Sequence, residues 1–129
     1  AIGRVPRERM PWIAKFQNAF HGIYLGIVGQ SSFHVHLPMG LVVAGLAWGL
    51  GCTFWQWCVL GLCVGLVLSL ELLNSAVEYL ARGLCNEHNP DVGRALDTAS
   101  GAVLIASLTA AAVGGAIFLE RLLALWAGQ

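Results

Sequence analysis

From Phe16 to Leu70 the chain contains no Asp, Glu, Lys or Arg, and a second run free of these residues extends from Thr98 to Leu119. A helix needs about 20 mostly apolar residues to cross the hydrocarbon core of a bilayer. The two runs together supply enough residues for three such crossings. Charged residues make up 11% of the 129 residues, under half of the roughly 25% found in soluble domains. These features predict an all-α integral membrane protein with a single domain.

The expected elements follow from the two runs and from the residues that interrupt them. In chain order they are a basic tail (1–10), an amphipathic surface helix (11–32) and three transmembrane helices (33–50, 54–82 and 90–126). The third crossing is expected to begin at Pro90, because Asn89 supplies a capping side chain and proline suits a first helical turn.

The helix predicted over 11–32 combines basic residues, aromatic side chains and one apolar stripe. This combination is typical of a helix that lies in the membrane interface. The same pattern also fits a helix packed on the rest of the bundle, and both arrangements can hold together.

Small residues recur every four positions in the third predicted crossing, at Ala102, Ala106, Ala110 and Gly114. A row of small side chains lets another membrane helix approach closely. The row predicts tight packing, either within the bundle or between the subunits of an oligomer.

Charge is balanced overall but is unevenly distributed along the chain. Seven basic and seven acidic side chains cancel, which argues against a nucleic-acid partner, because such binding needs a concentrated basic surface. With three crossings, most basic residues fall on the side of the N-terminus: Arg4, Arg7, Arg9, Lys15, Arg82 and Arg94. The positive-inside rule places this side in the cytoplasm, the compartment that contains ATP.

Glu71, Asn74 and Glu78 lie three and four residues apart, so they share one face of the second predicted crossing. At 1.5 Å of rise per residue, Glu71 is on the order of 10 Å deeper in the membrane than Glu78. A carboxylate at such a depth is costly and usually persists because it has a function. The alternative is a structural network in which these side chains bond to Ser100, Arg94 or a neighbouring subunit.

The difference in depth predicts a division of roles. Glu78, near the surface, is suited to bind Mg²⁺, which prefers one or two carboxylates together with phosphate oxygens and water. Glu71 is suited to accept the proton of an alcohol that arrives from the lipid side. Asn74 can hydrogen-bond to either carboxylate, and Asp97 can orient a nucleotide or its metal. This arrangement indicates phosphoryl transfer to a lipid hydroxyl, although the sequence has neither a P-loop nor a protein-kinase glycine loop.

Two histidines near the start of the first crossing are further polar residues in an apolar run. His34 and His36 are two positions apart and therefore point to different faces of a helix. We expect interfacial or packing roles for them rather than metal binding.

The segment ELLNSAVE (71–78), followed by GRALD (93–97) and SGAVL (100–104), resembles the small bacterial membrane diacylglycerol kinase and undecaprenol kinase family. The likeness extends over residues 12–120 and includes a surface helix followed by three crossings. It implies a homotrimer in the bacterial inner membrane. Its composite active sites would lie near the cytoplasmic face and use Mg-ATP to phosphorylate diacylglycerol or undecaprenol.

By motif position, the resemblance also assigns roles to residues of this sequence. Glu71 matches the general base, Asn74 an active-site polar residue and Glu78 a metal ligand. Positions that match ATP contacts are Glu78, Glu87, His88, Asn89, Leu96 and Asp97, and those in the region of the lipid site are Lys15, Phe33, His36 and Ser100.

Some positions depart from the family's pattern. Gln30 stands where the family has a second metal-binding Glu, and Leu96 replaces a Lys that contacts phosphate. Both changes are expected to weaken Mg-ATP binding, and Lys15 or Arg94 can compensate. Two further departures are Arg82, at a position that is commonly Asp, and His21, at one that is commonly Lys or Arg. These departures leave a second reading open, a weakened or inactive family member that acts as a structural membrane subunit or lipid-binding scaffold.

Overall fold

The computed structural model describes residues 11–29, 33–84 and 86–128, and for 33–35 it describes the backbone alone. These residues form four helices: α1 (Trp12–Gly29), α2 (Phe33–Gly49), α3 (Phe54–Leu84) and α4 (Pro90–Trp126). They contain no strand, which confirms the all-α prediction. Among them, α3 and α4 are long and apolar enough to cross a membrane, whereas α2 is a shorter apolar helix of 17 residues.

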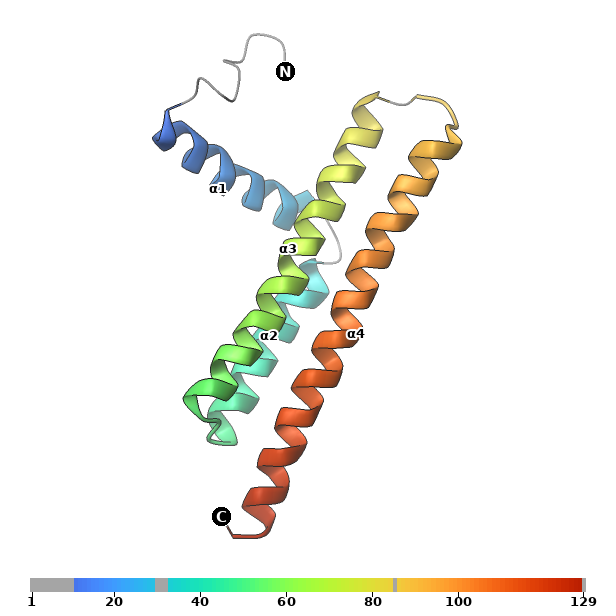
Figure 1. The fold of residues 1–129 in the computed structure, drawn as a ribbon. Coiled ribbons are helices and arrows are strands. Elements are labelled where there is room, and N and C mark those ends of the chain that lie inside the picture. The colour runs from blue at the N-terminus through green and yellow to red at the C-terminus, as the bar shows by residue number, and fades with distance from the viewer. Residues whose placement is uncertain (1–10, 30–32, 85, 129) are drawn as a thin grey trace.

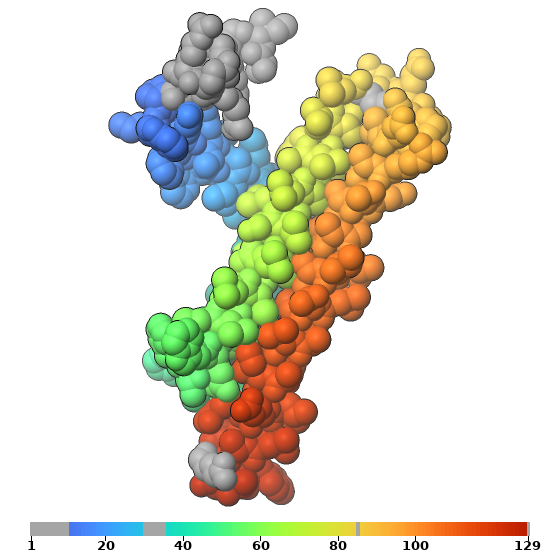
Figure 2. Space-filling model, in the orientation of Figure 1, coloured from blue at the N-terminus to red at the C-terminus, as the bar shows by residue number. Residues whose placement is uncertain are grey.

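The helices α3 and α4 run antiparallel along most of their length and form the body of the molecule (Figure 1). The helix α2 lies beside the first half of α3, to which it is joined by a tight turn. The helix α1 runs obliquely to this body. Its C-terminal end meets α3, while its N-terminal half stands away from the upper ends of α3 and α4 (Figure 2).

The row of small residues on α4 packs against α3 within the same chain. Ala106 is 3% exposed and is the one buried residue of α4 in the described structure. A Cβ added at Gly114 would lie 3.7 Å from Cδ2 of Leu60, so this glycine faces α3 at van der Waals distance. Small side chains here allow the two helix backbones to approach closely.

The turn between α2 and α3 is closed by backbone and side-chain contacts. Gly51 has a φ of 66°, which a residue with a Cβ rarely adopts. Thr53 and Gln56 form a reciprocal cap at the start of α3, with backbone-to-side-chain hydrogen bonds of 2.9 and 3.3 Å. Arg121 of α4 donates from Nε and Nη2 to the carbonyl of Leu50, at 3.1 and 3.0 Å. The guanidinium therefore ties the end of α4 to the α2–α3 turn.

Most large apolar side chains of the described helices are exposed on the isolated chain. Among the described residues, the buried apolar side chains are few: Ala47, Leu60, Val67 and Ala106. Large exposed apolar surfaces mark contacts with lipid or with other protein chains. The isolated chain thus has only a small buried core. The largest fully buried side chain in the described structure is that of a polar residue, Glu71.

Candidate functional site

Glu71 lies in the middle of α3, and its side chain is 2% exposed. Ser75, one turn later on the same helix, is also buried, and its hydroxyl donates to the carbonyl of Glu71 at 2.9 Å. Burial of a carboxylate away from water carries a large free-energy penalty unless other groups stabilise it. The groups that surround Glu71 therefore determine how this carboxylate is stabilised.

A titratable side chain of α2 lies beside the Glu71 carboxylate. Nδ1 of His36 lies 2.9 Å from Oε1 of Glu71, and the two side chains are 26% and 2% exposed. His36 belongs to the first turn of α2, which begins at Phe33. The unpaired N–H groups of a helix N-terminus favour a nearby negative charge. Both the imidazole and the start of α2 thus suit a carboxylate at this position.

One turn nearer the end of α3, Asn74 and Glu78 form a second polar pair. Nδ2 of Asn74 donates to Oε1 of Glu78 at 3.1 Å. This bond fixes the orientation of the amide, whose Oδ1 is buried and has no hydrogen-bond partner among the described residues. A buried carbonyl oxygen without a partner is uncommon in folded proteins. It marks a place where an added group can bind.

The donor set beside Asn74 fits a magnesium ion. The Glu78 carboxylate and the Asn74 amide carbonyl are hard oxygen ligands, and Mg²⁺ commonly uses one or two carboxylates and takes the rest of its shell from phosphate and water. Within residues 11–29, 33–84 and 86–128 there is no cluster of three His, Cys, Asp or Glu side chains.

The end of α1 docks next to this pair through Tyr79. The hydroxyl of Tyr79 donates to the carbonyl of Leu25 at 3.2 Å, and a Cβ added at Gly29 would collide with the same hydroxyl. Glycine at position 29 thus allows α1 to approach α3 one residue beyond Glu78. Gln30, predicted as a departure from a metal-binding Glu, lies outside the described residues.

The residues predicted to contact ATP lie where α3 ends and α4 begins. Leu60 of α3 and Gly114 of α4 face each other across the antiparallel pair. Because both helices rise by the same distance per residue, a position a given number of residues after Leu60 lies level with the position the same number of residues before Gly114. This register places Leu96 and Asp97 at the level of Glu78. Leu96 is half-buried and Asp97 is exposed. The two helices thus bring Asp97 and Glu78 to one end of the molecule.

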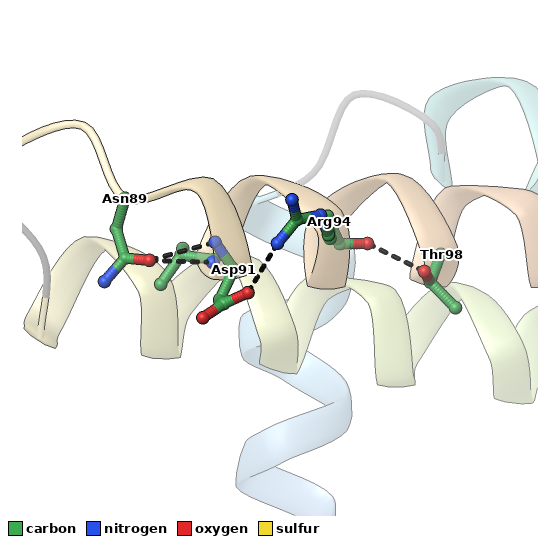
Figure 3. A network of polar contacts seen from close by, with 5 residues as sticks. Asn89, Asp91, Arg94 and Thr98 are labelled. Atoms are coloured by element: carbon green, nitrogen blue, oxygen red, sulfur yellow. Dashed lines mark hydrogen bonds and ion pairs between the residues drawn. The ribbon is translucent and has the colours of Figure 1, made fainter.

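Asn89 has a clear structural role at the start of α4 (Figure 3). Its Oδ1 accepts hydrogen bonds from the backbone N–H groups of Asp91, at 3.0 Å, and Val92, at 3.4 Å. Pro90 occupies the first turn, so the predicted helix start is confirmed. Glu87 and His88 are exposed in the preceding loop.

The side chains predicted for the lipid site are not brought together in the single chain. Lys15 lies near the start of α1, with its ammonium 4.6 Å from the ring centroid of Trp12. Ser100 is exposed on α4, and the side chain of Phe33 lies outside the described residues. His36 contacts Glu71 from α2.

An apolar cavity of about 420 Å³ lies between α2, α3 and α4, and His36 is one of its lining residues. Gly40 and Val43 of α2 face it, as do Leu60 and Val67 of α3. The cavity therefore extends along the apolar part of the bundle as far as His36, the residue that contacts Glu71.

Within the single chain, Arg94 pairs with a residue of its own helix. Nη1 of Arg94 binds Oδ1 of Asp91 at 2.7 Å, three residues earlier on α4, and both side chains are largely exposed (Figure 3). Sequence reasoning placed His36 in the region of the lipid site but did not predict its contact with Glu71. The two are far apart in the sequence, and a histidine in an apolar helix gives no signal of which other helix it will face.

Comparisons with known proteins agree with the motifs. The family model described as prokaryotic diacylglycerol kinase matches residues 17–118. An undecaprenol kinase of Bacillus subtilis is 29% identical over 107 residues, which cover 83% of this chain and 87% of the relative. A diacylglycerol kinase of Synechocystis sp. is 33% identical over 114 residues, covering 88% of this chain and 65% of that protein. No solved structure gives a significant match.

Proposed function

Because the chain belongs to the prokaryotic diacylglycerol kinase family and is a lipid kinase, we propose that it transfers the γ-phosphate of Mg-ATP to the hydroxyl of a membrane lipid. The acceptor is diacylglycerol or undecaprenol, the two alcohols in the names of its relatives. The observation that carries this proposal is the fully buried Glu71, which shares a face of α3 with the Asn74–Glu78 pair.

In this proposal Glu71 is the general base. The lipid hydroxyl gives its proton to a carboxylate oxygen of Glu71 while its own oxygen attacks the γ-phosphorus. The bond between that phosphorus and the β–γ bridging oxygen breaks, and ADP leaves. A positioned base of this kind contributes about 10²- to 10⁴-fold to a rate, and its burial keeps water from competing for the phosphoryl group.

Glu78 and Asn74 bind and orient the nucleotide in this account. When present, Mg²⁺ would neutralise charge on the phosphates and hold them in line with the acceptor. The Glu78 carboxylate and Oδ1 of Asn74 would supply oxygen ligands on the face of α3 that also carries Glu71. Asp97, at the same level on α4, orients the nucleotide from the neighbouring helix.

The departures at positions 30 and 96 do not remove this core. Leu96 offers no charge to the phosphates, so the chain relies on its remaining polar groups near Glu78. The enzyme reading is favoured over a non-catalytic scaffold because the relatives are named as kinases and because Glu71, Asn74, Glu78 and Asp97 are all present.

We also propose that α2, α3 and α4 all cross the membrane and that three chains form a trimer. α2 is 17 residues long, close to the lower limit for a crossing. Exposed apolar side chains on every helix supply surface for lipid and for neighbouring chains. With three crossings, the N-terminus and the α3–α4 loop lie on the cytoplasmic side of the bacterial inner membrane, because most Lys and Arg residues fall there.

The direct test is a transfer assay with purified protein in detergent or vesicles. Mg-ATP carrying a γ-phosphate label is supplied with diacylglycerol or with undecaprenol in separate reactions. We expect label in at least one lipid, which would also name the acceptor. No label in either lipid, from protein that is folded and oligomeric, would overturn the proposed reaction.

A further inference from the structure

The contact between His36 and Glu71 links the first turn of α2 to the buried carboxylate of α3. Nδ1 of His36 is 2.9 Å from Oε1 of Glu71. The nitrogen is itself buried, although the residue as a whole is 26% exposed, and it makes no hydrogen bond of good angle with any described residue. The Nδ1 edge of the ring therefore faces inward, and Glu71 is the acceptor within reach.

The 2.9 Å between the two atoms is within hydrogen-bond distance, so Nδ1 can donate to the carboxylate oxygen when it carries the ring proton. Leaving a buried polar atom unsatisfied costs about 1–3 kcal/mol, which favours the donating arrangement. His36 is carried by a helix, α2, and Pro38 follows two residues later. A donor on a helix fixes the rotamer of its partner more firmly than a donor on a loop.

We propose that His36 is a positioning residue for the base: its Nδ1–H donates to Oε1 of Glu71 and holds the carboxylate in the orientation that receives the lipid hydroxyl. This inference rests on the proposed function, since it assigns Glu71 the role of base. His36 does not itself take the proton in this account. Its contribution is geometric, and misplacement of a catalytic group by about 1 Å can lower a rate by about 10²-fold.

Two variants separate positioning from packing. His36→Leu keeps a side chain of similar bulk beside the cavity but has no donor. His36→Asn is smaller, yet its Nδ2 can occupy the place of Nδ1 and donate to the same oxygen. A packing role predicts that Leu is the better replacement, whereas a positioning role predicts that Asn is.

In the transfer assay we expect His36→Leu to lower kcat by about 10- to 100-fold with little change in the KM for the lipid or for Mg-ATP. His36→Asn should restore kcat to within about fivefold of the unmutated protein. In the background of Glu71→Gln, His36→Leu should cause no further loss, because the two residues act as a unit. Leu41→Ala, at an exposed position on α2, is the control and should change kcat by less than about twofold.

A second readout does not depend on turnover. Nitrogen-15 NMR of histidine-labelled protein reports the four imidazole rings, and the His36 signals are identified by their absence in His36→Asn. We expect Glu71→Gln to move the His36 Nδ1 resonance more than it moves those of the other three histidines.

The two readouts distinguish failure of this inference from failure of the proposed function. An Nδ1 resonance that does not respond to Glu71→Gln would overturn the pairing, even in an active protein. Full activity of His36→Leu, or loss in His36→Asn as large as in His36→Leu, would overturn the positioning role. An unmutated chain that transfers no label would sink the kinase reaction, while the NMR result would still decide whether His36 holds Glu71.

Discussion

Nδ2 of Asn74 donates to Oε1 of Glu78 across one turn of α3, at 3.1 Å. The bond has two consequences for the C-terminal part of α3. It holds the Glu78 carboxylate in one orientation, and it turns the amide carbonyl of Asn74 into a buried position without a hydrogen-bond partner among the described residues. In the proposed function, the Glu78 carboxylate and this carbonyl oxygen are the protein's contribution to the nucleotide and metal site.

The first prediction concerns the metal requirement of Glu78→Gln. The substitution keeps the shape of the side chain and removes its negative charge, so the affinity for Mg²⁺ should fall. We expect the Mg²⁺ concentration at half-maximal activity to rise at least about 10-fold, the range seen when groups at a metal site are altered. A titration of activity with Mg²⁺ at constant ATP measures this.

Glu120→Gln provides the matched control for that titration, because Glu120 is exposed near the far end of α4. It makes the same change of charge at a distance from the Asn74–Glu78 pair. An unchanged Mg²⁺ dependence in Glu78→Gln, or an equal shift in both variants, would remove Glu78 from the metal site.

The second prediction concerns the close approach of α1 to α3. Gly29→Ala should displace the end of α1, because the added Cβ meets the hydroxyl of Tyr79. Gly22→Ala is the control on the same helix, since nothing lies within 4 Å of its added Cβ, and it should stabilise the helix by about 0.5–1 kcal/mol.

Hydrogen–deuterium exchange of the α1 amides measures the displacement. Exchange should be faster in Gly29→Ala and unchanged or slower in Gly22→Ala. Adding Tyr79→Phe to Gly29→Ala should reverse part of the effect, because it removes the colliding oxygen. Equal exchange in the two alanine variants would contradict the docking seen between α1 and α3.

The third prediction separates two roles of Asn89. Asn89→Ala removes the acceptor that caps α4 and should lower the free energy of unfolding by about 1 kcal/mol. Asn89→Ser keeps a capping oxygen but lacks the Nδ2 group, so stability should stay close to that of the unmutated protein. If Nδ2 contacts the nucleotide, the KM for ATP should rise in both variants.

Thermal unfolding in detergent and ATP titration of the activity check these outcomes side by side. Asn86→Ala, a change of the same kind in the exposed loop before the cap, should leave the unfolding midpoint unchanged. A normal KM for ATP in Asn89→Ser would show that Asn89 serves the helix start alone.

The fold was predictable where local signals decide it. The charge-free runs indicated long apolar helices, and α3 and α4 are such helices. The Asn89–Pro90 pair predicted where α4 begins, because an N-cap and a first-turn proline act within a few residues. The four-residue spacing of Ala106 and its neighbours predicted a close helix contact, and the structure places that contact against α3.

The site was predictable only within one helix. Helical periodicity places Glu71, Asn74 and Glu78 on a common face, and the hydrogen bond between Asn74 and Glu78 follows from their spacing. Contacts between helices are different, because they depend on how α1 and α2 rotate about their own axes. The contact of His36 with Glu71 and that of Tyr79 with Leu25 have no counterpart in any local pattern.

The central claim is that the buried carboxylate of Glu71 is the base that activates a lipid hydroxyl. The measurement that tests it most directly is the rate of labelled phosphate transfer from Mg-ATP to diacylglycerol and undecaprenol by Glu71→Gln beside the unmutated protein. Size-exclusion chromatography and thermal unfolding confirm that the two proteins are equally folded and have the same oligomeric state. We predict that turnover falls by at least about 10²-fold while the fold and the oligomer are kept. Turnover within tenfold of the unmutated rate would contradict the assignment of Glu71 as the base.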